Sequence, residues 1–190
     1  QEGRAWQQVY RECVVASPNW LMHRSTLAEI GGFNGLSYPE DYDLVFRWYE
    51  HSLEVHCLPQ VTLLWREHSA RTSRNSENYQ QAAFFKLKLQ RFVSLEQPLQ
   101  NLVLWGTGLK GKLAAKQLLA QNVSFRWMAL QPEKHPEGLL RRAIESYVNL
   151  NQIESPKVLL AVYPPPSERA SLEKFLANLR LKEGKQWWYL

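Results

Sequence analysis

A glycine-rich turn between a short apolar strand and a helix is the feature that most constrains the fold. Residues 102–105 (Leu-Val-Leu-Trp) predict the strand, residues 106–111 are Gly-Thr-Gly-Leu-Lys-Gly, and residues 112–120 favour a helix. Glycines at this spacing permit a tight turn and let backbone amides at the helix start approach a phosphate. The sequence therefore predicts a nucleotide-binding loop formed by Gly106, Gly108 and Gly111.

Strands and helices continue to alternate after this loop. We expect strands at 124–130, 158–163 and 187–190, a helix near 139–145, and a second helix that is capped by Ser167 and ends at Gly184. Alternating elements are typical of a small parallel sheet with helices on both faces. The predicted fold class is therefore α/β, with a Rossmann-like domain in the C-terminal part of the chain.

One element of a dinucleotide site is missing from this pattern. The acidic residue that grips a ribose about 20 residues after the loop is absent. The second strand ends in Ala129-Leu130-Gln131, and Glu133 follows only after Pro132. We therefore expect a phosphate-bearing ligand held by backbone amides near Lys110, with weak affinity for NAD. A nucleotide-binding oxidoreductase, a sugar-nucleotide-binding module and a non-catalytic interaction domain remain alternatives.

A second informative feature is the acidic block Pro39-Glu40-Asp41-Tyr42-Asp43, which holds the only two aspartates of the chain. Ser37 and Glu40 have the spacing of a capping box, and Pro39 is tolerated in a first helical turn. Asp41 is thus expected in the first turn of a helix. A carboxylate there faces the positive end of the helix dipole, so it should stay ionised near neutral pH and be able to accept a proton.

Four segments in one order resemble the family two glycosyltransferases of the GT-A type. In that family an apolar strand, an Arg-x-x-Leu segment, Gly-Gly-Phe, Glu-Asp-x-Asp-Leu-x-x-Arg and Tyr-Arg-x-His-x-x-Ser-x-Ser follow one another. The matching segments here are Trp20-Leu21-Met22-His23-Arg24, Leu27-Ala28-Glu29-Ile30-Gly31-Gly32-Phe33, Glu40-Asp41-Tyr42-Asp43-Leu44-Val45-Phe46-Arg47 and Trp65-Arg66-Glu67-His68-Ser69-Ala70-Arg71-Thr72-Ser73.

The resemblance implies an inverting transfer of a sugar from a nucleotide-sugar to a glycan or lipid-linked acceptor. Asp41 matches the catalytic base, which removes the proton of the attacking hydroxyl. Glu40, Asp43 and Arg47 would border the acceptor or position the base, with Asp43 and Arg47 paired at the i,i+4 spacing. His68 would help to hold a divalent metal, Mg or Mn, beside the departing diphosphate.

The resemblance also implies a division of the chain. Residues 1–75 would complete the acceptor side of a glycosyltransferase catalytic domain, residues 76–99 would form a connecting helix, and residues 100–190 would be the Rossmann-like domain. The nucleotide-sugar half, with an Asp-x-Asp motif after an apolar strand, is expected upstream of Gln1, so this piece alone should be inactive. Residues 101–190 also resemble the small Rossmann-like domain of some bacterial sugar-modifying enzymes, including sugar acyltransferases, whose ligand is a nucleotide-linked sugar.

Charge and composition narrow the expected partners. Residues 1–75 carry 7 basic and 9 acidic side chains, whereas residues 76–190 carry 16 and 9. No zinc finger or aromatic RNA-binding pattern accompanies the basic excess, so nucleic acid is not expected. Cys13 and Cys57 lack metal spacing and are expected as reduced thiols. We expect a cytoplasmic protein. The apolar side chains of a helix at 79–95 should pack between the two halves of the chain, and the alternative is that its aromatic and basic side chains rest on the inner face of the membrane.

Overall fold

The chain forms two compact units, residues 1–95 and 96–190. Our computed structural model describes residues 6–15, 17–35, 39–64, 66 and 81–190. Helix α4 (Gln81–Leu95) belongs to the first unit, whereas the sequence suggested a separate connecting helix at 76–99.

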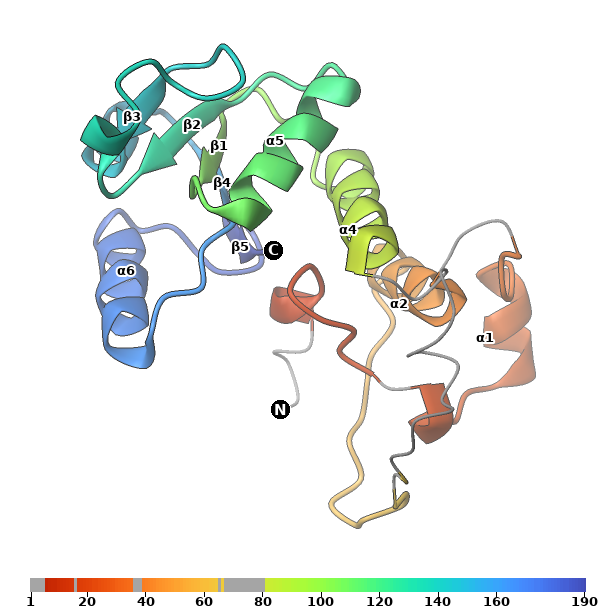
Figure 1. Cartoon of the computed structure of the whole chain (residues 1–190). Coiled ribbons are helices and arrows are strands. Elements are labelled where there is room, and N and C mark those ends of the chain that lie inside the picture. The colour runs from red at the N-terminus through yellow and green to blue at the C-terminus, as the bar shows by residue number, and fades with distance from the viewer. Residues whose placement is uncertain (1–5, 16, 36–38, 65, 67–80) are drawn as a thin grey trace. The chain divides into compact units, whose positions relative to one another are not determined.

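The second unit is a five-stranded parallel sheet with the strand order β3-β2-β1-β4-β5 (Figure 1). Its strands are β1 (Leu102–Trp105), β2 (Arg126–Ala129), β3 (Ile144–Ser146), β4 (Lys157–Leu160) and β5 (Trp187–Tyr189). Two α-helices, α5 (Leu109–Ala120) and α6 (Pro166–Asn178), and two 3-10 helices, Pro132–Lys134 and Tyr147–Gln152, connect them. This confirms the α/β class and the parallel sheet that the alternation of elements predicted.

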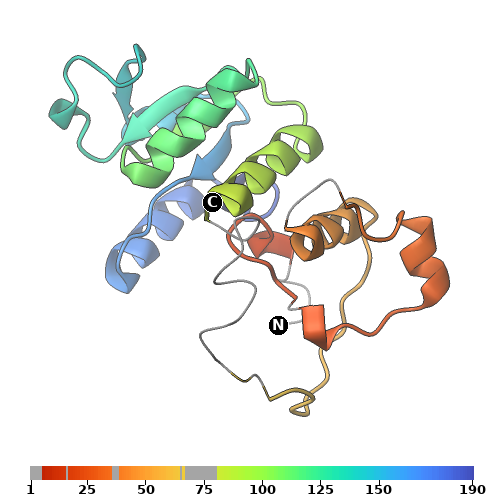
Figure 2. The same ribbon diagram turned by 45° about the vertical axis from the view of Figure 1, so that its right-hand side comes forward.

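The two faces of the sheet are covered by different helices. Val103 and Trp105 of β1 share a buried cluster with Leu172 and Leu176 of α6. The intervening residue of β1, Leu104, is also buried, and successive side chains of a strand point to opposite faces. Helix α5, whose buried residues are not in that cluster, runs along the other face (Figure 2). Right-handed crossovers from a central strand to either side produce this arrangement.

Two predicted elements of this unit were wrong. Residues 139–145 form no helix, because Leu140 and Arg141 adopt left-handed backbone angles (φ 49° and 59°) that no α-helix contains. The chain instead turns and enters β3, where Arg126 of β2 forms an ion pair with Glu145. Helix α6 begins at Pro166, so Ser167 lies inside it and is not its cap. It ends at Asn178, six residues before the predicted end at Gly184. Proline at the first helical position has a φ angle suited to starting a helix.

Gly106 and Gly111 of the loop are required by packing, whereas Gly108 is not. Gly106 has φ 129°, and a Cβ there would lie 2.7 Å from the carbonyl oxygen of Ala161. A Cβ on Gly111 would lie 1.9 Å from the carbonyl oxygen of Gly106. A Cβ on Gly108 would meet nothing within 4 Å. The start of α5 therefore rests directly on the backbone that leaves β1.

The first unit contains three α-helices and two short 3-10 helices among its described residues. They are α1 (Arg24–Glu29), α2 (Glu40–Glu50), α4 (Gln81–Leu95), and the 3-10 helices Trp6–Gln8 and Ser17–Asn19. Tyr10, Phe46 and Phe92 pack together, with ring centroids 5.4 Å apart for Tyr10 and Phe46 and 5.2 Å apart for Tyr10 and Phe92. This aromatic contact joins the N-terminal segment to α2 and α4.

No strand occurs among the described residues of this unit, so a GT-A fold is not established by it. Residues 20–23, which match the apolar strand of the family pattern, are not in a strand, and α1 begins at Arg24. In the part of the chain that the structure describes, no helix is long and apolar enough to cross a membrane.

Substitution of Gly111 by Ala should destabilise the second unit severely. The new methyl group would force α5 away from Gly106, at a cost at or above the ~1–3 kcal/mol typical of an overpacked core. The matched control is Gly108→Ser, because that position is open and serine is a good N-cap residue. Urea unfolding should show a large loss for Gly111→Ala and little change for Gly108→Ser; equal losses would contradict the packing described here.

Candidate functional site

Asp41 lies in the first turn of α2, as the sequence predicted, in a half-buried position. Its Oδ1 accepts the amide N–H of Tyr42 at 2.8 Å, and the Ser17 side chain also hydrogen-bonds it. Burial nevertheless raises the pKa of Asp41 above its ordinary value of 3.8, and the nearby Glu40 adds to this rise. The position of Asp41 at a helix start predicts the opposite, because the helix dipole favours the ionised form. Desolvation outweighs the hydrogen bonds that favour the charged form.

Asp43 is fully buried and paired with two arginines. Its Oδ2 lies 3.2 Å from Nη2 of Arg47, which confirms the predicted i,i+4 pair. Its Oδ1 accepts a hydrogen bond of 2.5 Å from Nη2 of Arg91 on α4. The sequence gave no signal for Arg91 as a partner, because 48 residues separate it from Asp43. Asp43 thus fastens α2 to α4 and has no exposed surface for an acceptor.

Arg47 connects the acidic block to the Gly-Gly segment. Its Nη1 donates to the carbonyl oxygen of Ile30 at 2.9 Å. That carbonyl follows α1, where Gly31 and Gly32 adopt φ angles of 83° and 60° and reverse the chain. Glycine adopts such angles at little cost and commonly ends helices in this way. The two separated motifs of the first unit are therefore in direct contact through one side chain.

Glu40 and Cys13 are two other ionisable residues close to Asp41. Glu40 is the first residue of α2, in a partly buried position, and Pro39 is the N-cap residue. The predicted capping box is therefore wrong, since it requires Ser37 at the N-cap and Glu40 three residues later. Ser37 itself lies outside the described residues. Cys13, which is expected to be a reduced thiol, lies close enough to Asp41 for the charge of that residue to act on it. Burial first and that charge second raise the pKa of Cys13 to about 12.

The predicted metal ligand cannot be placed in this site. His68 lies outside the described residues, so its role stays a prediction. Among the described residues, no group of three or more His, Cys, Asp or Glu side chains could hold a metal ion.

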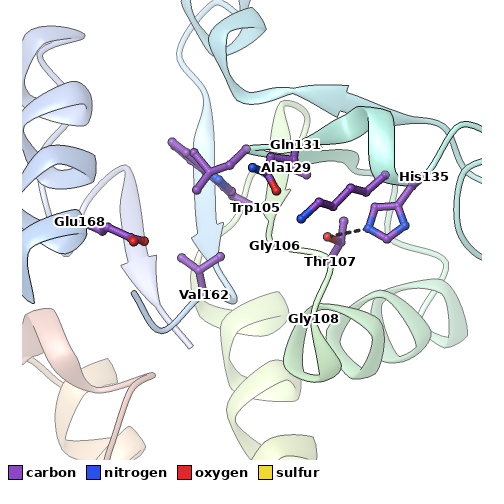
Figure 3. Close-up of a pocket in the computed structure, with 11 residues that line it drawn as sticks. Trp105, Gly106, Thr107, Gly108, Ala129, Gln131, His135, Val162 and Glu168 are labelled. Carbon is purple, nitrogen blue, oxygen red and sulfur yellow. Dashed lines mark hydrogen bonds between the residues drawn. The ribbon is translucent and has the colours of Figure 1, made fainter. Parts of the chain in front are cut away.

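The glycine loop borders a pocket of about 610 Å³ at the carboxyl ends of β1, β2 and β4 (Figure 3). The residues that line it are Trp105, Gly106, Thr107, Gly108, Ala129, Leu130, Gln131, Lys134, His135, Val162 and Glu168. Ligand sites usually have volumes of about 300–1,000 Å³. The strand order reverses at β1 and β4, and such switch points are where open α/β sheets bind ligands.

The loop is held in place by hydrogen bonds from β2 and its following segment. The Gly106 N–H donates to the carbonyl of Met128 at 2.9 Å, and the Trp127 indole N–H donates to the carbonyl of Gly106 at 2.8 Å. Nε2 of His135 lies 3.0 Å from the Thr107 hydroxyl oxygen. These contacts fix the loop before any ligand arrives.

Lys110 does not supply the positive charge of this pocket, contrary to expectation. Its ammonium donates to the main-chain carbonyl of Leu190 at 3.1 Å and lies 4.6 Å from the centre of the Tyr163 ring. Lys134 and His135, from the segment that follows β2, line the pocket in its place. No periodic pattern in residues 131–138 indicates which of their side chains would face the loop.

Comparisons of the chain with protein-family models, with curated proteins and with solved structures find no match. The site must therefore be interpreted from its own geometry and from the sequence motifs.

Replacement by Asn should change the free energy of unfolding in opposite directions at the two aspartates of α2. Since the folded-state pKa of Asp41 is raised, its contribution to stability is complete below pH 3.8 and is lost as pH rises through the folded pKa. Asp41→Asn should therefore raise the free energy of unfolding at neutral pH. It should also remove the loss of stability that accompanies the ionisation of Asp41 as the pH rises. Asp43→Asn should lower it by about 3–5 kcal/mol, because two arginines lose a buried partner.

Urea unfolding between pH 3 and pH 7, followed by hydrogen exchange of the α2 amides, measures both effects. A loss of stability in Asp41→Asn comparable to that in Asp43→Asn would contradict the different roles assigned to them.

Proposed function

We propose that the first unit carries the catalytic base of an inverting glycosyltransferase, with Asp41 as that base. The observation that supports this most is the contrast between two carboxylates on the same helix. Asp43 is buried between Arg47 and Arg91, whereas Asp41 is half-buried and has a raised pKa. A general base works best when its pKa approaches the working pH, and burial moves Asp41 in that direction. A side chain whose ionisation costs stability is also typical of a functional site.

In this proposal an acceptor hydroxyl approaches the carboxylate of Asp41. The hydroxyl oxygen attacks the anomeric carbon of a nucleotide-sugar while Asp41 takes its proton, and the bond from that carbon to the diphosphate breaks. The ion pairs of Asp43 hold α2 in place, so the base keeps its position during the transfer. Glu40 keeps the pKa of Asp41 raised by its negative charge.

The donor half of the site is assigned to polypeptide outside these residues. The exposed apolar side chains of the extended segment 53–64 support this assignment. Leu58, Val61 and Leu64 are 69%, 82% and 89% exposed, and several exposed apolar side chains in one short segment are suited to packing against another part of a protein. The metal of the proposal, Mg or Mn, would be held there, with His68 as an added ligand.

The partners of the proposal are a nucleotide-sugar donor and a glycan or lipid-linked acceptor, without nucleic acid. A lipid-linked acceptor would place the enzyme in the cytoplasm at the inner membrane surface. This location depends on the lipid-linked acceptor, and the acceptor is itself proposed from the motif resemblance.

Replacement of Asp41 by Asn tests the proposal in an enzyme that carries this unit together with its donor half. Turnover should fall by about 10² to 10⁴, the usual contribution of a general base, while donor affinity and the hydrogen exchange of α2 stay unchanged. Unchanged turnover would remove Asp41 from the mechanism. A fall in donor affinity of the same size would show that Asp41 acts in binding.

A further inference from the structure

We propose that the pocket beside the glycine loop of the second unit binds a nucleoside phosphate with an unesterified terminal phosphate. The phosphate lies at the start of α5, beside Lys134 and His135, and the nucleoside occupies the apolar part of the pocket. The site is separate from the proposed glycosyl transfer, because every residue that lines it belongs to the second unit.

The geometry of the loop leaves room for a phosphate at the helix start. Gly108 is the N-cap residue of α5, and the space that its side chain would fill is open. The first amide groups of a helix have no partner within the helix and point toward an anion placed at its start. Gly106 and Gly111 are explained by packing, but no neighbour within the described residues requires glycine at position 108. A ligand close to the backbone would require it.

The charged side chains of the pocket determine the orientation of the ligand. Figure 3 shows His135 beside Thr107 on one side of the pocket and Glu168 on the other. Lys134, next to His135 in the sequence, also lines the pocket. A phosphate is attracted to the side of Lys134 and repelled from Glu168. The sugar and base therefore extend toward Glu168, whose carboxylate accepts hydrogen bonds from hydroxyl and N–H groups.

An indole N–H on the pocket wall is a second observation that points to a ligand. Trp105 lines the pocket and is 1% exposed, yet its Nε1 has no hydrogen-bond partner among the described residues. Its ring stacks on Tyr147, with the centroids 5.2 Å apart. An unsatisfied buried donor is costly, and a small rotation of the ring toward the pocket would let a ligand acceptor satisfy it. Ala129 and Val162 supply apolar surface around it.

The same features disfavour NAD. The position that grips a ribose diol in dinucleotide sites is neutral here, since Gln131 follows β2. The two phosphates of NAD are both esterified and carry one negative charge each, whereas a terminal phosphate carries about −1.5 to −2 at neutral pH. Lys134 and His135 therefore interact more strongly with a terminal phosphate than with a dinucleotide.

Calorimetric titration of the 190-residue chain with UDP, ADP, NAD and inorganic pyrophosphate tests the assignment. We expect UDP or ADP to bind at least tenfold more tightly than either NAD or pyrophosphate. NAD binding as tight as that of the nucleoside diphosphates would overturn the terminal-phosphate assignment. Pyrophosphate binding of equal strength would overturn the nucleoside assignment, and no binding of any probe would overturn the site.

Three variants test where in the second unit the phosphate binds. Gly108→Ser and Lys134→Ala should each weaken nucleoside diphosphate binding at least tenfold, the first by obstruction and the second by loss of charge. Lys110→Gln removes an equal charge from the same loop but from outside the pocket, so its affinity should stay within about twofold of the original. A loss in Lys110→Gln equal to that in Lys134→Ala would overturn the proposed position of the phosphate. Thermal unfolding of each variant shows whether the fold is retained.

Discussion

The buried carboxylate of Asp43 is the interaction on which the first unit depends. Removing such a charge from water costs several kcal/mol, and only close opposite charges offset that cost. Arg47 and Arg91 supply them, and each also ties Asp43 to a different part of the unit. Arg91 brings α4 onto α2, and Arg47 reaches the carbonyl of Ile30 at the end of α1. The first turn of α2, with Asp41 in it, is positioned by this network.

In the second unit, backbone packing rather than an ion-pair network holds the candidate site in position. The carbonyl of Gly106 accepts the Trp127 indole N–H, and α5 rests so closely on it that position 111 cannot carry a side chain. The loop is therefore rigid without a ligand, which lowers the entropic cost of binding one. The two units thus present different chemistry: a carboxylate of raised pKa in the first, and amide donors beside Lys134 in the second.

Local patterns predicted much of this structure, and long-range contacts account for the rest. The glycine spacing and apolar runs predicted β1, β4 and the parallel sheet, and the i,i+4 spacing predicted the Asp43–Arg47 pair. Strand β3 was missed because its three residues are specified by pairing with β2 rather than by periodicity. Arg91, Lys134 and His135 were missed as site residues because only the tertiary fold brings them to their partners. The raised pKa of Asp41 depends on burial, which its position at a helix start does not reveal.

The two aspartates of α2 have different environments: Asp43 is buried between two arginines, and Asp41 is half-buried with a raised pKa. Titration of the side-chain carboxyl carbon of Asp41 by NMR tests this claim most directly, because Asp41 and Asp43 are the only aspartates in the chain and selective labelling yields two signals. Asp41→Asn, which should keep the fold, identifies which signal is which. The structure predicts that Asp41 titrates above 3.8, as burial requires. A pKa at or below 3.8 would show that Asp41 is an ordinary helix-start carboxylate and would contradict the account.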